Sequence, residues 1–121
     1  MDDDIYRENI LDHYKHPRNF GSLKNSTTHI TDSLISCGDE LEMDIVVENN
    51  KLTDICFNGK GCAISMAAAS MLTEVSKGKS IADLKRFTPA NMVSLLGIPL
   101  TPTRLKCALL SLQVLHKAIN E

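Results

Sequence analysis

The hydrophobic pattern of the chain changes its period at Gly61, and this change constrains the fold more than any other feature. Through residues 41–48 apolar and polar side chains largely alternate, which is typical of a strand with one buried face. Asn49-Asn50 then predicts a tight hairpin turn into a second strand over residues 51–57, because asparagine tolerates positive φ. Residues 62–75 are mostly helix formers. The sequence therefore predicts a hairpin that leads directly into a helix.

Local signals predict the remaining elements. The mixed apolar and charged pattern of residues 5–13 predicts a first helix, which must end before Pro17 because the residue preceding a proline avoids the helical region. A strand over residues 28–35 would complete a three-stranded antiparallel sheet. Three more helices begin with a cap residue, followed in two cases by proline: Ser80, Thr88-Pro89 and Thr101-Pro102.

The last of these helices extends nearly to the C-terminus, and its apolar residues form one predicted stripe: Leu105, Ala108, Leu109, Leu112, Leu115 and Ile119. Together the elements predict an α+β fold class, with a small three-stranded antiparallel sheet, helices packed on one face and a long C-terminal helix. Residues 1–121 are expected to form a single domain, since a chain of this length buries a sufficient core without disulfides or metals.

Composition and charge exclude several classes of function. The net charge is −2, no basic run is present, and three Phe and two Tyr are the only aromatic residues, so no nucleic-acid partner is expected. The sequence starts Met-Asp-Asp-Asp, unlike a signal peptide, and has no apolar run long enough to span a membrane. We therefore expect a cytoplasmic protein without a membrane partner, whose four cysteines serve metal or thiol chemistry rather than disulfides.

Three cysteines stand far apart in the sequence, and a carboxylate lies two residues beyond the first. Cys37, Asp39, Cys62 and Cys107 together supply three thiols and one oxygen, a suitable four-coordinate set for zinc or an iron–sulfur cluster. The wide separations do not match the Cys-x-x-Cys knuckles of common zinc modules. Taken one at a time, each residue also has an ordinary alternative, either a solvated aspartate at a strand end or a buried cysteine in a helix.

Positive charge lies near two of these thiols in the sequence. Cys62 opens a predicted helix, where the macrodipole favours a thiolate, and Lys60 precedes it by two residues. Cys107 follows Arg104 by about one helical turn and is adjacent to Lys106. Because cations favour the thiolate form, Lys106 is expected to give electrostatic support to an anionic sulfur on Cys107.

The fourth cysteine and the histidines are assigned to the framework. Cys56 lies between Ile55 and Phe57 in the second hairpin strand, so it should point to the opposite face as a half-buried structural thiol; a spare ligand or a sulfur-relay partner is the alternative. No histidine pairs with a cysteine at ligand spacing, and all four are expected on the surface: His13, His16, His29 and His116.

Four stretches of the chain carry a family resemblance: residues 6–21, which include His-Tyr-Lys-His-Pro-Arg-Asn-Phe-Gly; Cys37-Gly38-Asp39; residues 59–65, Gly-Lys-Gly-Cys-Ala-Ile-Ser; and Lys106-Cys107. In this order and at these separations they resemble the U-type iron–sulfur cluster scaffold family, which comprises IscU, SufU and the N-terminal domain of NifU. The match runs nearly end to end. It therefore strengthens the hypothesis of a metal or cluster site.

The resemblance implies a scaffold or carrier rather than an enzyme. A cysteine desulfurase would deliver persulfide sulfur to a thiol, with Cys107 as the candidate acceptor, and a transient [2Fe–2S] cluster would form and pass to apo iron–sulfur proteins. The implied ligands are Cys37, Asp39, Cys62 and Cys107, with zinc or iron in the resting site. A carboxylate is a harder and more labile ligand than a thiolate, which suits a cluster that must be released.

Departures from the family pattern leave its branches open. Lys106 stands where IscU has a histidine, which favours a SufU-like, zinc-dependent sulfur acceptor, whereas the short separation of Cys62 and Cys107 favours IscU. Residues 100–104 lack one proline and the valine of the IscU chaperone-recognition sequence Leu-Pro-Pro-Val-Lys. A third hypothesis is a structural zinc site in an interaction module.

Overall fold

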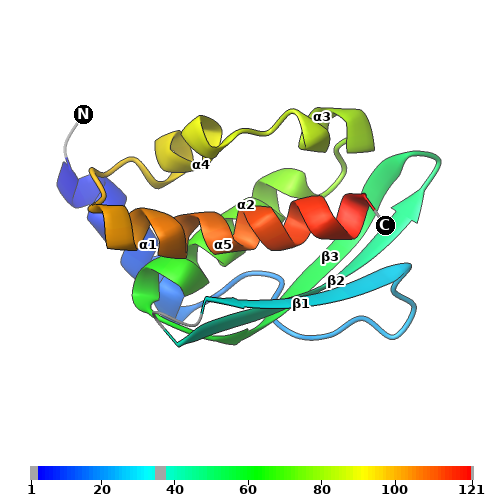
Figure 1. Ribbon diagram of the computed structural model, residues 1–121, viewed down its shortest axis with the longest axis horizontal. Coiled ribbons are helices and arrows are strands. Elements are labelled where there is room, and N and C mark those ends of the chain that lie inside the picture. The colour runs from blue at the N-terminus through cyan, green and yellow to red at the C-terminus, as the bar shows by residue number, and fades with distance from the viewer. Residues whose placement is uncertain (1–2, 35–37, 121) are drawn as a thin grey trace.

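The computed structural model describes residues 3–34 and 38–120, so Cys37 and the predicted strand residue Ile35 lie outside the described residues. Its elements follow one another in chain order (Figure 1): α1 (Asp3–Lys15), β1 (Thr28–Leu34), β2 (Asp39–Glu48), β3 (Lys51–Lys60), α2 (Ala63–Ser76), α3 (Ile81–Lys85), α4 (Pro89–Leu96) and α5 (Pro102–Ile119). The predicted order of helices and strands is confirmed. Among the described residues, no helix is long and apolar enough to cross a membrane.

The three strands form one antiparallel sheet in the order β1-β2-β3, which confirms the predicted meander. Asn49 and Asn50 form the hairpin turn with φ angles of 52° and 62°, the positive values that the sequence predicted. In the register of the hairpin, Glu40 lies opposite Lys60. This pairing brings the start of β2 beside the end of β3, and therefore brings Asp39 next to the loop that enters α2.

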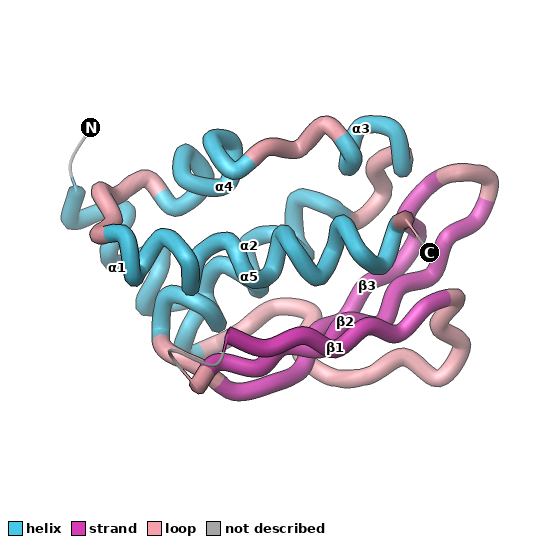
Figure 2. The backbone as a smooth tube through the Cα atoms, in the orientation of Figure 1, coloured by secondary structure: helices cyan, strands magenta, loops and turns pink. Residues whose placement is uncertain are grey.

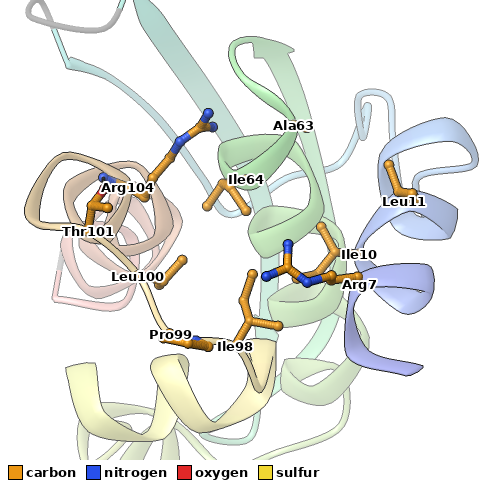
Figure 3. Close-up of a pocket in the computed structure, with 10 residues that line it drawn as sticks. All are labelled: Arg7, Ile10, Leu11, Ala63, Ile64, Ile98, Pro99, Leu100, Thr101 and Arg104. Atoms are coloured by element: carbon orange, nitrogen blue, oxygen red, sulfur yellow. Dashed lines mark hydrogen bonds between the residues drawn. The ribbon is translucent and has the colours of Figure 1, made fainter. Parts of the chain in front are cut away.

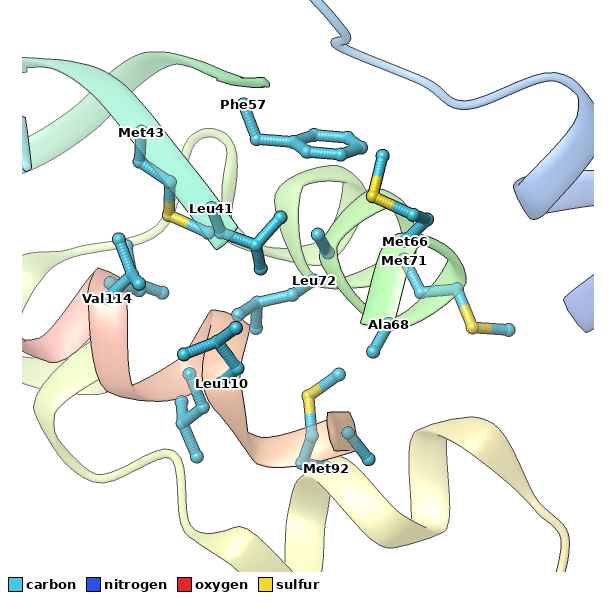
Figure 4. Packing of buried hydrophobic residues seen from close by; sticks show 14 of the residues in the cluster. Leu41, Met43, Phe57, Met66, Ala68, Met71, Leu72, Met92, Leu110 and Val114 are labelled. Atoms are coloured by element: carbon cyan, nitrogen blue, oxygen red, sulfur yellow. The ribbon is translucent and has the colours of Figure 1, made fainter. Parts of the chain in front are cut away.

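The helices cover one face of the sheet, as the predicted fold class requires (Figures 1 and 2). α5 packs across β1 and β2, and α2 packs against β3, α1 and α5. Between them lies a core of fully buried side chains, part of which is drawn in Figure 4: Leu41, Met43, Phe57, Leu72, Met92, Leu110 and Val114. This packing holds the starts of α2 and β2 together with α5 at one end of the molecule.

The predicted helix starts are capped by their own side chains. Ser80, Thr88 and Thr101 each accept a hydrogen bond from the backbone N–H three residues later. α2 begins in a related way, because Cys62 is its N-cap and the sulfur accepts a bond from the Ser65 N–H. A predicted ligand is therefore also the residue that caps a helix.

The predicted stripe on α5 is incomplete. Leu105 and Leu109 are only half-buried, whereas Leu110 and Val114, which the stripe leaves out, are buried completely. The reason is that α5 contacts the sheet on one side and α2 and α4 on others, so more than one face of the helix is covered.

The expectation of four surface histidines is wrong for His13. Its ring is 5% exposed, and its Nδ1 lies 2.7 Å from the hydroxyl oxygen of Ser70, so it ties α1 to α2. Burial lowers the pKa of His13, which favours the neutral ring in this position. His116 is half-buried against the carbonyl oxygen of Leu84, while His16 and His29 are exposed as predicted.

The face of the sheet that carries no helix is partly covered by the segment after α1. Residues 19–21 pair with Phe57 at the edge of β3, and the Leu23 N–H donates to Asp44 Oδ2 at 2.9 Å. Cys56 lies opposite Asp44 in the register and is half-buried, whereas Ile55 and Phe57 face the core. This placement confirms that Cys56 points away from its two neighbours.

Candidate metal centre

Three of the predicted ligands come from three different elements and meet at one end of the molecule. Asp39 is the first residue of β2, Cys62 caps α2, and Cys107 lies in the second turn of α5. One ligand atom of each lies within 4.8 Å of those of the other two. Cys37, the fourth predicted ligand, is outside the described residues but precedes Asp39 by two positions. We refer to Asp39, Cys62 and Cys107 as the candidate centre.

The three residues differ in their exposure. Asp39 and Cys107 are each only 2% exposed, whereas Cys62 is half-buried. A carboxylate and a thiol therefore form the floor of the candidate centre, and Cys62 is the member most accessible to solvent.

Gly61 is required by the close approach of the Asp39 carboxylate. A Cβ atom at position 61 would lie 2.7 Å from Asp39 Oδ1 and 3.0 Å from its carboxylate carbon. Any larger residue would push the carboxylate out of its place. The glycine before Cys62, which the sequence suggests only as part of a motif, thus has a steric function.

Hydrogen bonds fix the orientation of Asp39. The Cys62 N–H donates to Oδ1 at 2.9 Å, the Ser65 hydroxyl donates to Oδ2, and the Cys62 thiol donates to Oδ2 at 3.7 Å. Burial alone would raise the pKa of Asp39, but the hydrogen bonds from Ser65, from the Cys62 N–H and from the thiols of Cys107 and Cys62 outweigh it and lower the pKa. The carboxylate is therefore held in its ionised form.

Ser65 is the site residue that the sequence analysis missed. It is completely buried, donates to Asp39, and has its N–H on the sulfur of Cys62 at 3.5 Å. A signal was available, because a residue three positions after a helix N-cap commonly contacts that cap.

The donor set of the candidate centre suits the groups that the sequence predicted. Thiolates are ligands of zinc and of iron–sulfur clusters, and carboxylate oxygens also bind zinc. Cys62 lies at the N-terminus of α2, where it caps the helix. The described residues would supply three of four ligands, so the chemistry fits a zinc ion or an iron–sulfur cluster.

The lysine expected to support Cys107 is not part of the candidate centre. Lys106 is exposed, whereas Cys107 is buried. Adjacent residues on an α-helix point about 100° apart, so the ammonium faces solvent while the thiol faces inward. Any effect of Lys106 on the thiol therefore acts through its charge at a distance.

Cys56 is also separate from the candidate centre, because it lies on the outer face of β3. Burial, followed by the charge of Asp54, raises its thiol pKa. These surroundings are those of an unreactive structural thiol.

An open pocket of about 410 Å³ lies beside the first residues of α2 and α5 (Figure 3). Ala63 and Ile64, which follow Cys62 directly, line one wall, and Arg104 comes from the turn of α5 before Cys107. The other lining residues come from α1 and from the loop between α4 and α5: Arg7, Ile10, Leu11, Ile98, Pro99, Leu100 and Thr101. The pocket is thus mainly apolar, with guanidinium groups contributed from two sides.

Comparisons with known proteins identify the family of this chain. Residues 5–121 match the family model of the NifU-like N-terminal domain. The chain therefore belongs to this family, and the resemblance stated from the sequence is confirmed.

Individual relatives cover almost the whole chain. The "Iron-sulfur cluster assembly scaffold protein IscU" of Buchnera aphidicola subsp. Schizaphis graminum is 33% identical and aligns over 96% of this chain and 92% of its own length. The "Zinc-dependent sulfurtransferase SufU" of Bacillus subtilis (strain 168) is 35% identical over 134 aligned positions, which cover 97% of this chain and 90% of the relative. That alignment is longer than this chain of 121 residues, so SufU carries residues that are absent here.

A solved structure also matches closely. It is a protein assigned as an iron–sulfur cluster assembly scaffold for the SUF system, from thermophilic Fervidobacterium islandicum AW-1. The TM-score is 0.83 at 27% identity, and the match covers 98% of this chain and 99% of the other. The fold is therefore shared over its full length.

Proposed function

We propose that this protein is an iron–sulfur cluster assembly scaffold. It accepts sulfur from a cysteine desulfurase, binds iron or a transient [2Fe–2S] cluster as cargo, and passes the cluster to apo iron–sulfur proteins. The observation that carries the proposal is the convergence of the ligand atoms of Asp39, Cys62 and Cys107 within 4.8 Å, in a chain that matches the NifU-like N-terminal domain. The relatives named IscU and SufU support the same function.

The proposed ligands are Cys37, Asp39, Cys62 and Cys107. Asp39, Cys62 and Cys107 are included because their ligand atoms lie within 4.8 Å of one another. Cys37 is added because it precedes Asp39 by only two residues and would complete a four-coordinate set. Cys107 is the proposed acceptor of persulfide sulfur. When the site holds no cluster, a zinc or iron ion would keep the thiolates paired.

The mixed ligand set suits a protein that must release what it binds. Three thiolates hold soft metal ions firmly, whereas one carboxylate is a weaker partner for them. The adjacent apolar pocket with Arg7 and Arg104 supplies a surface on which a partner can rest beside Cys62. We propose that residues 1–121 act as one domain in the cytoplasm.

A zinc-dependent sulfur acceptor is the second candidate. It is favoured by the SufU relative, whose name includes zinc-dependent sulfurtransferase, and by Lys106 at the position where the IscU branch has histidine. In that function zinc would be resident, and sulfur would leave Cys107 without cluster assembly on this chain. A purely structural zinc module is disfavoured, because half-buried Cys62 leaves the candidate centre accessible.

Anaerobic reconstitution distinguishes these candidates. The purified protein is mixed with ferrous iron, cysteine and a cysteine desulfurase, and visible absorption and circular dichroism are recorded. The scaffold function predicts a brown protein with a [2Fe–2S] spectrum that is lost on addition of an apo-ferredoxin. Colourless protein that retains zinc and gains persulfide would support the sulfur acceptor instead, and colourless protein that gains neither would leave the structural zinc module.

A further inference from the structure

Ser65 lies at the third position of α2, and its hydroxyl is close to all three members of the candidate centre. The oxygen donates to Asp39 Oδ2, lies 3.5 Å from the sulfur of Cys62, and lies 3.4 Å from the carbonyl oxygen of Cys107. The side chain is completely buried. Because a hydroxyl has a single proton, it donates fully to only one of these three acceptors at a time.

We propose that Ser65 is a hydrogen-bond switch that controls how firmly Asp39 holds a metal. In the metal-free protein the hydroxyl donates a hydrogen bond to Asp39 Oδ2. When a metal takes the carboxylate, the hydroxyl turns to the sulfur of Cys62 or to the carbonyl of Cys107. This inference rests on the metal site of the proposed function, but it does not depend on the identity of the cargo.

The alternative acceptors make such a change inexpensive. A buried hydroxyl without a partner is unfavourable, so a residue tied to Asp39 alone would resist the loss of that bond. Ser65 has two further acceptors within 3.5 Å, and neither requires its backbone to move. The carbonyl of Cys107 is a neutral acceptor, so the bond to the ionised Asp39 carboxylate is the stronger one.

The switch changes metal affinity in a defined direction. The hydrogen bond from Ser65 stabilises the metal-free carboxylate of Asp39, so a metal must compete with this bond in order to bind. When the metal leaves, the hydrogen bond forms again. Ser65 therefore lowers affinity and speeds release. A residue that only orients a ligand has the opposite effect, because its removal weakens metal binding.

The test is the zinc affinity of Ser65→Ala, measured by competition with a chromophoric chelator, together with the rate at which zinc-loaded protein loses its metal to excess chelator. We expect Ser65→Ala to bind zinc about tenfold more tightly and to release it more slowly, as loss of a bond to a charged group implies. Its thermal midpoint should fall more in the metal-free form, which loses the bond to the ionised carboxylate, than in the zinc-loaded form. Ser65→Thr keeps the hydroxyl and should restore the wild-type affinity.

Ser70→Ala is the matched control. Ser70 is equally buried on α2, but its hydroxyl contacts His13 and the Arg18 N–H instead of the candidate centre. This change should destabilise both forms alike and leave zinc affinity unaltered. In an Asp39→Ala background, Ser65→Ala should have no further effect on affinity, since the acceptor is gone.

The outcomes separate the switch from the metal site itself. Unchanged or weaker zinc binding by Ser65→Ala overturns the switch and leaves the scaffold function standing. A wild-type protein that binds neither zinc nor cobalt overturns both. If metal-free Ser65→Ala does not fold, the release rate from zinc-loaded protein still decides, because slower release supports the switch and equal or faster release overturns it.

Discussion

Two aspartates of β2 lie close to cysteines: Asp39 to Cys62, and Asp44 to Cys56. The two pairs differ in the groups that surround them. Asp39 accepts from the N-terminus of a helix and its partner thiol caps that helix. Asp44 accepts instead from the Leu23 N–H and from the ring of His29, on the face of the sheet without helices. Within residues 3–34 and 38–120, a third potential ligand, Cys107, joins the first pair but not the second.

The difference shows that proximity of a thiol and a carboxylate does not define a site. Asp39 is ionised and lies close to two thiols, so three ligands for a cation are already close together there. At the second pair, burial raises the pKa of Cys56 and favours the neutral thiol. The carboxylate of Asp44 is hydrogen-bonded to the ring of His29. The helix N-terminus and the third ligand separate a candidate centre from a structural contact.

Replacement of the thiols should give the largest difference between the two pairs. Cys37→Ser, Cys62→Ser and Cys107→Ser should each abolish stable binding of zinc or a cluster, because a serine hydroxyl is a poor ligand for these metals. Cys56→Ser should retain the wild-type metal content. Elemental analysis of anaerobically purified protein measures the result, and any variant among the first three that keeps a full complement of metal removes that residue from the proposed set.

Replacement of the two aspartates tests whether ligation by oxygen sets the release rate. Asp39→Ala should slow transfer of the cluster to an apo-ferredoxin, by about tenfold, because the labile ligand is lost and the thiolates remain. Asp44→Asn keeps the shape of the other carboxylate and should leave transfer unaltered. Circular dichroism follows the transfer in time, and equal rates for Asp39→Ala and wild type would show that Asp39 does not control release.

The sequence predicted the fold and the candidate centre to different depths. Alternation in residues 41–48, the Asn49-Asn50 turn and the cap residues are local signals, and the corresponding elements formed as predicted. The meeting of Cys62 with Cys107 is a tertiary contact, which the family motifs indicated but periodicity did not. Ser65 was missed for the same reason, since its contact with Asp39 spans β2 and α2.

The burial of His13 also escaped prediction from the sequence. Its neighbours in α1 are mostly exposed and charged, so the local pattern indicates a surface position. Only the packing of α1 on α2 provides Ser70 as a hydrogen-bond partner and makes burial of the ring favourable. Contacts between distant elements therefore account for what the sequence did not reveal.

The hydrogen bond between His29 and Asp44 contributes a pH-dependent term to the stability of the protein. The hydrogen bond with Asp44 raises the pKa of His29 above its unfolded value of 6.5. The stabilisation is therefore fully present below about pH 6.5 and is lost as the pH rises through the folded pKa. His29→Gln should lower the free energy of unfolding at pH 6 by less than about 1 kcal/mol, because half of the ring is exposed. Urea unfolding at pH 6 and pH 9 measures it, and an equal difference at both values would contradict the assignment.

The smallest expected effect is that of Lys106, whose charge bears on the acceptance of sulfur, a step that both proposed functions share. An ammonium has no lone pair at neutral pH, so Lys106 cannot ligate a metal as a histidine could, and Lys106→Ala should keep its metal. Lys106 is exposed while Cys107 is buried, so its solvated charge should favour an arriving persulfide anion only weakly. We expect sulfur acceptance from a desulfurase to slow by less than about fivefold.

Mass spectrometry of persulfide against time measures the rate, with Lys117→Ala, at the other end of α5, as the control for loss of one positive charge. A rate that is the same for Lys106→Ala, Lys117→Ala and wild type would identify Lys106 as an ordinary surface lysine.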